Sequence, residues 1–208
     1  MIGIWNYTVI LTYMSASLSV LGATLSFKGK LVKAVGCLAL AGLCDAFDGR
    51  VARSRKESTE REKLFGMQLD SLCDVISFGI YPAILCYQMG VRNRIGIVLM
   101  IMYVIAAIAR LAYFNVLELE QKNDEDGVKC YYGLPVTSIA VIFPCVLFVG
   151  YWLPPAYMPL LLQLMLLITG GLFVSNLRIR KPTVFQILMM VLLVMALFVT
   201  IPFLRIGM

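Results

Sequence analysis

Long apolar runs separated by short charged turns extend along almost the whole chain. Each run approaches the roughly 20 residues that an α-helix needs to cross a bilayer. The pattern predicts seven membrane-spanning helices, at about residues 6–27, 31–53, 64–89, 95–117, 132–152, 157–174 and 184–204. The first run has no positively charged segment before it and no A-x-A site after it, so we expect it to be retained as a span.

The composition agrees with a membrane protein. Of the 208 residues, 61% are hydrophobic and only 14% are charged, whereas an average soluble domain has about 25% charged residues. We therefore expect an all-α, polytopic helical bundle that forms a single transmembrane domain over residues 1–208. Its core would lie at about residues 6–152, and the spans within 157–204 carry no motif that we can assign.

The net charge of +6 indicates contact with anionic lipid headgroups rather than with nucleic acid. The turns after the second, fourth and sixth predicted spans hold nine basic residues, and the opposite side holds six. Positive charge favours the cytoplasmic side, so we expect a multi-pass protein of the cell membrane with these turns in the cytoplasm.

The side chains available for chemistry are restricted. The chain has no histidine, so acid–base catalysis would need a carboxylate, lysine, tyrosine or cysteine. Its six cysteines form no C-x-x-C pair and five of them lie in apolar stretches. We interpret the cysteines as small buried hydrophobic residues, not as disulfides or zinc ligands.

Four aspartates are the only acidic residues inside apolar sequence, because the other eight lie in the loops 54–63 and 118–129. Asp45 and Asp48 are three residues apart near the end of the second predicted span. Asp70 and Asp74 are four residues apart near the start of the third. Each pair therefore shares one helix face, and an antiparallel arrangement of the two spans would bring the faces together near one membrane surface.

Four carboxylates this close repel one another unless cations lie between them. Two divalent ions would offset their charge, and oxygen-only ligands suit Mg²⁺ or Mn²⁺. Such ions commonly bind a substrate phosphate. Gly49, Ala52 and Gly66 are small enough for a bulky ligand to approach the helices, and Arg53 could pair with a diphosphate.

Two other interpretations of the aspartates are a structural polar network between spans and a proton or cation path in a small transporter. A transporter of this kind is expected to place acids near the bilayer midplane and to break helices at paired positions. The sequence shows neither pattern.

The aspartates and their neighbours match the pattern D-x-x-D-G-x-x-A-R followed by G-x-x-x-D-x-x-x-D, and the chain resembles the CDP-alcohol phosphotransferases. The matching positions are Asp45, Asp48, Gly49, Ala52, Arg53, Gly66, Asp70 and Asp74. The resemblance implies a membrane enzyme with a six-helix core, often a homodimer, in which an alcohol displaces CMP from a CDP-linked lipid. It also implies that Asp45, Asp48 and Asp70 hold two divalent metal ions, that Asp74 is both ligand and general base, and that Gly49, Ala52 and Arg53 face the CDP group.

Residues 70–83, 110–115 and 133–135 look like the phosphatidylserine synthase branch of that family. This similarity implies CDP-diacylglycerol and L-serine as substrates and CMP as a product. Because the acids lie near the turn after the second predicted span, we expect the active site to face the cytoplasm. The alternative is the same chemistry with another acceptor, such as glycerol phosphate or an inositol phosphate.

The chain departs from the family pattern at three places. Twelve residues separate Arg53 from Gly66, where eight are usual. The family often has a hydroxyl group in this loop near the diphosphate, and Thr59, with Ser58 next, is our candidate. Tyr113 replaces a common arginine and Val136-Thr137 replaces a common second proline; both changes bear on the choice of acceptor.

Overall fold

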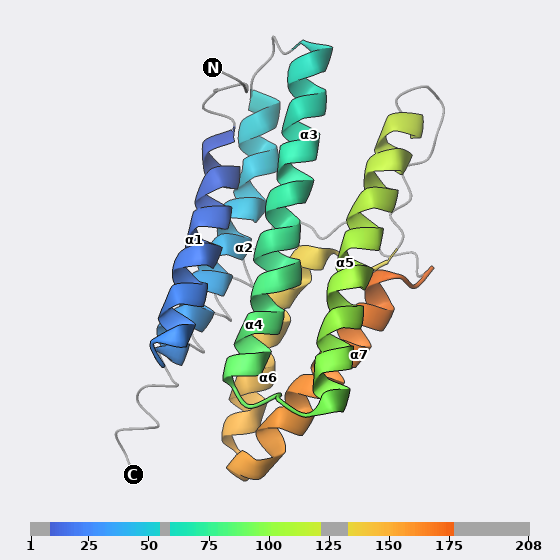
Figure 1. Ribbon diagram of the computed structural model, residues 1–208. Coiled ribbons are helices and arrows are strands. Elements are labelled where there is room, and N and C mark those ends of the chain that lie inside the picture. Colours follow the sequence, from blue (N-terminus) through green and yellow to red (C-terminus); the bar gives the residue numbers. More distant parts are fainter. Residues whose placement is uncertain (1–8, 55–58, 122–132, 177–208) are drawn as a thin grey trace.

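The computed structural model describes residues 9–54, 59–121 and 133–176, and every regular element in these ranges is helical (Figure 1). The α-helices are α1 (Ile10–Phe27), α2 (Leu31–Ser54), α3 (Glu60–Asp74), α4 (Tyr81–Gln88), α5 (Arg94–Gln121), α6 (Ile139–Tyr151) and α7 (Met158–Phe173). A π-helical turn, η2 (Val75–Ile80), joins α3 to α4 without a break, and 3₁₀ turns η3 (Val136–Ser138) and η4 (Pro155–Tyr157) precede α6 and α7. The prediction of an all-α fold is confirmed.

Six of the seven predicted spans correspond to described helices, and the seventh, at 184–204, lies outside the described residues. Among the described residues, four stretches are long and apolar enough to cross a membrane: Ile10–Phe27, Glu60–Gln88, Arg94–Glu120 and Pro155–Phe173. Val136–Tyr151 is apolar but shorter. These helices support the predicted polytopic membrane protein.

Local sequence signals explain where several helices begin and end. Thr59 and Asn93 start α3 and α5, since their side-chain oxygens accept the backbone N–H groups of Glu62 (3.2 Å) and Gly96 (3.0 Å). Gly29 and Gly90 follow α1 and α4 with φ of +72° and +105°, a backbone conformation that favours glycine. Helix α3 thus begins four residues before the predicted boundary because its capping residue lies in the charged loop.

Helix α1 buries its polar face and exposes its apolar one. The buried residues are Thr12, Ser15, Ser19, Gly22 and Ser26, whereas Val20, Leu21 and Phe27 are among those exposed. Small residues allow close helix packing in membranes, and a Cβ at Gly22 would meet Tyr81 and Cys37. Helix α1 accordingly lies alongside α2 and contacts α4 (Figure 1).

The α3–α4 rod lies between the α1–α2 pair and the α5–α7 pair (Figure 1). Its buried side chains Phe78, Tyr81 and Leu85 lie in one apolar core with Tyr103 of α5 and Phe143 of α6. Within the described ranges the cysteines are free and buried or partly buried, as predicted; Cys130 lies outside these ranges. The rod that carries Asp70 and Asp74 is therefore anchored in the core by the part that follows them.

Candidate metal centre

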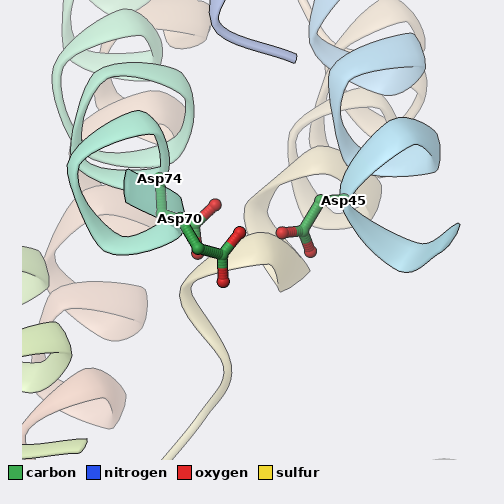
Figure 2. A group of neighbouring side chains, drawn as sticks. All are labelled: Asp45, Asp70 and Asp74. Carbon is green, nitrogen blue, oxygen red and sulfur yellow. The ribbon is translucent and has the colours of Figure 1, made fainter. Parts of the chain in front are cut away.

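Three of the four predicted acids meet between α2 and α3. Asp45 extends from α2 toward Asp70 and Asp74 of α3 (Figure 2), and one carboxylate oxygen from each lies within 4.8 Å of the others. Asp74 is buried, with 8% of its surface exposed, and Asp45 and Asp70 are partly buried. The antiparallel helix pair expected from the spacing therefore brings carboxylates from both helices to one place.

Asp48 lies one helical turn beyond Asp45 and is not part of this three-residue group. It is buried, and the Thr12 hydroxyl of α1 donates a hydrogen bond of 3.4 Å to its Oδ2. Its negative charge also acts on Asp70. Asp48 is thus a neighbour of the group and is linked to α1, a contact that helical periodicity within α2 could not reveal.

The three carboxylates suit a hard divalent cation. Asp70 Oδ1 is buried and has no hydrogen-bond partner among the described residues. A buried polar oxygen without a partner is costly, and a cation would satisfy it. The group offers oxygen ligands alone, the donor set that Mg²⁺ and Mn²⁺ prefer.

Arg110 of α5 supplies positive charge to the same region. Its positive charge interacts favourably with the negative charges of Asp74 and Asp45. Its guanidinium lies 5.7 Å from the centre of the Phe114 ring. The Nε atom is buried and makes no hydrogen bond within the described ranges. Arg110 belongs to the segment 110–115 that resembles the family, and an arginine deep inside an apolar run is itself a signal of a functional site.

A polar contact also joins α3 to α5 beside the acids. The hydroxyl of Ser71, the residue after Asp70, donates a hydrogen bond of 3.0 Å to Asn115 Oδ1. Both residues belong to segments that resemble the family. This contact fixes α3 against the helix that carries Arg110.

The predicted substrate-binding residues fall into three groups. At Gly66 of α3, an added Cβ would meet no atom within 4 Å, so the helix surface is open there. Gly49, Ala52 and Arg53 lie in the last turns of α2, and their side chains, like Ser58, are outside the described part of the chain.

Thr59 forms a capping box with Glu62, since its N–H donates to the Glu62 carboxylate (2.9 Å) and its hydroxyl oxygen accepts the Glu62 N–H.

Thr59 lies eleven residues before Asp70 along α3, which corresponds to about 16 Å of helix. Its role near a diphosphate stays a prediction, because its described contacts are those of a helix cap.

Comparison with known proteins gives information on the family that does not depend on the geometry of the site. The sequence model of the family described as CDP-alcohol phosphatidyltransferase matches residues 5–207. A CDP-diacylglycerol–serine O-phosphatidyltransferase from Saccharomyces cerevisiae is 34% identical over 144 residues, which cover 66% of this chain and 51% of the relative. An archaetidylserine synthase from Methanothermobacter thermautotrophicus is 38% identical over 146 residues, covering 69% of this chain and 58% of the relative.

A further CDP-diacylglycerol–serine O-phosphatidyltransferase, from Helicobacter pylori, is 35% identical over 141 residues, covering 65% of this chain and 55% of the relative. The matched regions thus span little more than half the length of these curated relatives.

Proposed function

Because this chain belongs to the CDP-alcohol phosphatidyltransferase family, we propose that it transfers a phosphatidyl group from CDP-diacylglycerol to L-serine. The products would be phosphatidylserine and CMP. Relatives from yeast and Helicobacter are named for this reaction. The observation that carries the proposal is the convergence of Asp45, Asp70 and Asp74, whose oxygens lie within 4.8 Å of one another at a partly buried position.

The aspartates are the residues that would hold the metal ions. We assign Asp45, Asp48, Asp70 and Asp74 to two divalent cations, Mg²⁺ or Mn²⁺. When bound, such cations offset the charge of the diphosphate and of the departing CMP. The unpartnered Asp70 Oδ1 supports this assignment.

Asp74 is the proposed general base. In the proposed step the serine hydroxyl oxygen forms a bond to the β-phosphorus of CDP-diacylglycerol while the bond from that phosphorus to the bridging oxygen breaks. Asp74 accepts the hydroxyl proton, and CMP leaves with the bridging oxygen. Asp74 is buried, which keeps bulk water away from the group that takes the proton.

The CDP group would lie along the small residues of both acid-bearing helices. We assign Gly49, Ala52 and Arg53 of α2 and Gly66 of α3 to this contact. The open surface at Gly66 supports it, since nothing in the described structure fills the space that a side chain would occupy. Arg53 would pair with phosphate oxygens.

Arg110 favours an acceptor that is uncharged or zwitterionic. Among the described residues, it is a basic side chain whose charge interacts with those of Asp74 and Asp45, and a phosphorylated acceptor would need further cations. This supports serine over glycerol phosphate or an inositol phosphate.

A second candidate differs only in the lipid. The relative with 38% identity is named as an archaetidylserine synthase, so an ether-linked CDP lipid is the alternative donor. The acceptor and the aspartate chemistry would be the same in both cases.

We also propose that one domain covers residues 1–208, that the protein lies in the cell membrane with the acids facing the cytoplasm, and that it forms a homodimer. The bias of basic residues toward the turns after the second, fourth and sixth predicted spans supports the orientation.

The test is CMP release by the purified protein in detergent with Mn²⁺ or Mg²⁺. CDP-diacylglycerol and its ether-linked counterpart are each offered with serine, glycerol phosphate, inositol phosphate or no acceptor. Release that requires both serine and metal supports the proposal, and the preferred lipid decides between the two candidates. Release with another acceptor would support the same chemistry and reject serine as the acceptor. No release from folded protein would reject the proposed enzymatic activity.

A further inference from the structure

The turn that follows Asp74 is not α-helical. Residues Val75–Ile80 form a π-helical turn that starts directly after Asp74, and turns of this kind are frequent at functional sites. The sequence gives a reason, because Pro82 is the second residue of α4 and proline has no N–H group. In a continuous α-helix the carbonyl of Phe78 would accept the N–H of residue 82.

Tyr103 of α5 supplies a donor to that carbonyl. Its hydroxyl donates a hydrogen bond of 2.6 Å to the backbone oxygen of Phe78. Phe78 is 0% exposed and Tyr103 is 1% exposed, so bulk water does not reach this contact. Without the hydroxyl group, a carbonyl inside the membrane core would lose a partner, which is costly in a setting that offers no replacement.

Packing leaves Tyr103 little freedom to move away. The ring of Phe173 in α7 lies 5.4 Å from the Tyr103 ring, centre to centre. Gly170 of the same helix lies against Tyr103, since a Cβ there would come within 3.4 Å of the Tyr103 Cα. Helix α7 thus restricts the movement of Tyr103.

The same turn is held from its other side by α1. The Ser15 hydroxyl donates a hydrogen bond of 3.3 Å to the Ser77 hydroxyl oxygen, and both residues are buried. The segment that begins after Asp74 is therefore attached to α5 through Phe78 and to α1 through Ser77.

We propose that Tyr103 is a positioning residue for Asp74. Its hydroxyl group replaces the donor that Pro82 removes, holds the π-helical turn in place, and so sets the direction of the Asp74 carboxylate relative to Asp45 and Asp70. The part of this inference that concerns turnover depends on the proposed function, and the part that concerns the carboxylate cluster does not.

The test compares Tyr103→Phe with Tyr81→Phe as a matched control. Tyr81 is equally buried, and its hydroxyl also donates at 2.6 Å to a backbone oxygen, that of Ala34. Ala34 lies in the first turn of α2, where residue 38 supplies an N–H from the same helix. Both variants lose one buried hydroxyl group. Only Tyr103→Phe removes the donor to the Phe78 carbonyl, which has no α-helical N–H partner because residue 82 is proline.

We expect Tyr103→Phe to lower kcat about tenfold or more, because small displacements of a catalytic group are costly, with KM for the CDP lipid unchanged. Its Mn²⁺ affinity should fall about tenfold, the loss typical when a residue behind a metal ligand is changed. Tyr81→Phe should keep both values within about twofold of the wild type, even where its melting temperature falls equally. Equal kcat and equal Mn²⁺ affinity in the two variants would show that Tyr103 has a purely structural role and does not position Asp74.

Mn²⁺ binding followed by the spectroscopic signal of the free ion separates this inference from the proposed function. If the wild-type protein binds Mn²⁺ and shows no turnover, the proposed function is rejected. The Mn²⁺ affinities of the two variants would still decide whether Tyr103 positions Asp74.

A second comparison uses Pro82→Ala, which supplies an N–H four residues after Phe78. In that background the effect of Tyr103→Phe on Mn²⁺ affinity should shrink to about threefold or less, since coupled residues are not additive. The same tenfold effect in both backgrounds would overturn the link between Tyr103 and Pro82.

Discussion

At the scale of single residues, the aspartates are the first candidates for a chemical role, because each is costly in a membrane unless it has a partner. Asp45, Asp70 and Asp74 converge within 4.8 Å, and Asp70 Oδ1 is buried without a described partner. Arg110 adds one positive charge nearby, which leaves net negative charge for cations to offset. The three acids share one site, and we expect Asp74 to differ from Asp45 and Asp70 because it is also the proposed general base.

Replacement of Asp74 by asparagine removes the proposed base and keeps the size of the side chain. Turnover should fall about 10²- to 10⁴-fold, the usual contribution of a general base. Mn²⁺ binding should persist at reduced affinity, because Asp45 and Asp70 remain. Steady-state CMP release and Mn²⁺ titration measure the two effects, and turnover within tenfold of wild type would remove Asp74 from the base role.

Gly66 offers a test of the substrate surface in which stability and activity change in opposite directions. Gly66→Ala should stabilise the fold by about 0.5–1 kcal/mol, since alanine favours a helix over glycine and its Cβ would meet nothing within 4 Å. KM for the CDP lipid should nevertheless rise, and it should rise further in Gly66→Leu.

Gly171 of α7 is the matched control, because it is also helical and a Cβ there also meets nothing within 4 Å. Gly171→Leu should leave KM for the CDP lipid unchanged. An unchanged KM in Gly66→Leu would show that no ligand approaches this face of α3.

At the scale of helices, α3 carries two of the three clustered aspartates, Asp70 and Asp74. A capping box starts α3, and a π-helical turn directly follows Asp74. Helix α5 contacts the rod through Asn115 and Tyr103. Hydrogen bonds to α5 thus hold the rod at Ser71 and at Phe78, on both sides of Asp74.

Thr59→Ala separates the two roles considered for this hydroxyl group. As a cap, its loss should reduce stability by about 1 kcal/mol and leave KM for the CDP lipid unchanged. Thr59→Ser should preserve the cap and behave like wild type. A severalfold rise in KM for the alanine variant at full folding would instead support the predicted contact with the diphosphate, and thermal unfolding measured beside KM distinguishes the two.

The sequence allowed the acid cluster to be predicted because helical spacing is a local property of the chain. Helical periodicity and an antiparallel pair of spans were enough to predict that Asp45, Asp70 and Asp74 lie close together. Arg110 and Tyr103 could not be placed in this way, since their contacts depend on how α5 packs across more than twenty intervening residues. Thr59 and Glu62 do match the T-x-x-E pattern of a capping box, so that contact was present in the sequence as a local signal.

At the scale of the whole molecule, the cluster joins separate parts of the bundle. Asp45 belongs to the α1–α2 pair, and Asp70 and Asp74 belong to the central rod. A cation bound by all three would therefore bind only the folded arrangement. Metal binding and folding should be coupled for this reason.

Added Mn²⁺ should raise the stability of the purified protein. At a free concentration 100 times its Kd, a ligand that binds only the folded state adds about 2.7 kcal/mol to the free energy of unfolding. Thermal unfolding in detergent with Mn²⁺ and with EDTA measures the difference. Asp70→Asn should lose most of the metal-dependent shift, and an equal shift in that variant would place the ion elsewhere.

The hydroxyl groups of α1 have a consequence for how the protein enters the bilayer during synthesis. Ser17, Ser19, Thr24 and Ser26 each donate to a carbonyl three or four residues earlier in the same helix. The first span can therefore move into lipid before its neighbours exist, because these hydroxyl groups are already satisfied. Thr12 and Ser15 donate instead to Asp48 and Ser77, so the end of α1 beside the acids is completed only when the second and third spans have followed it into the membrane.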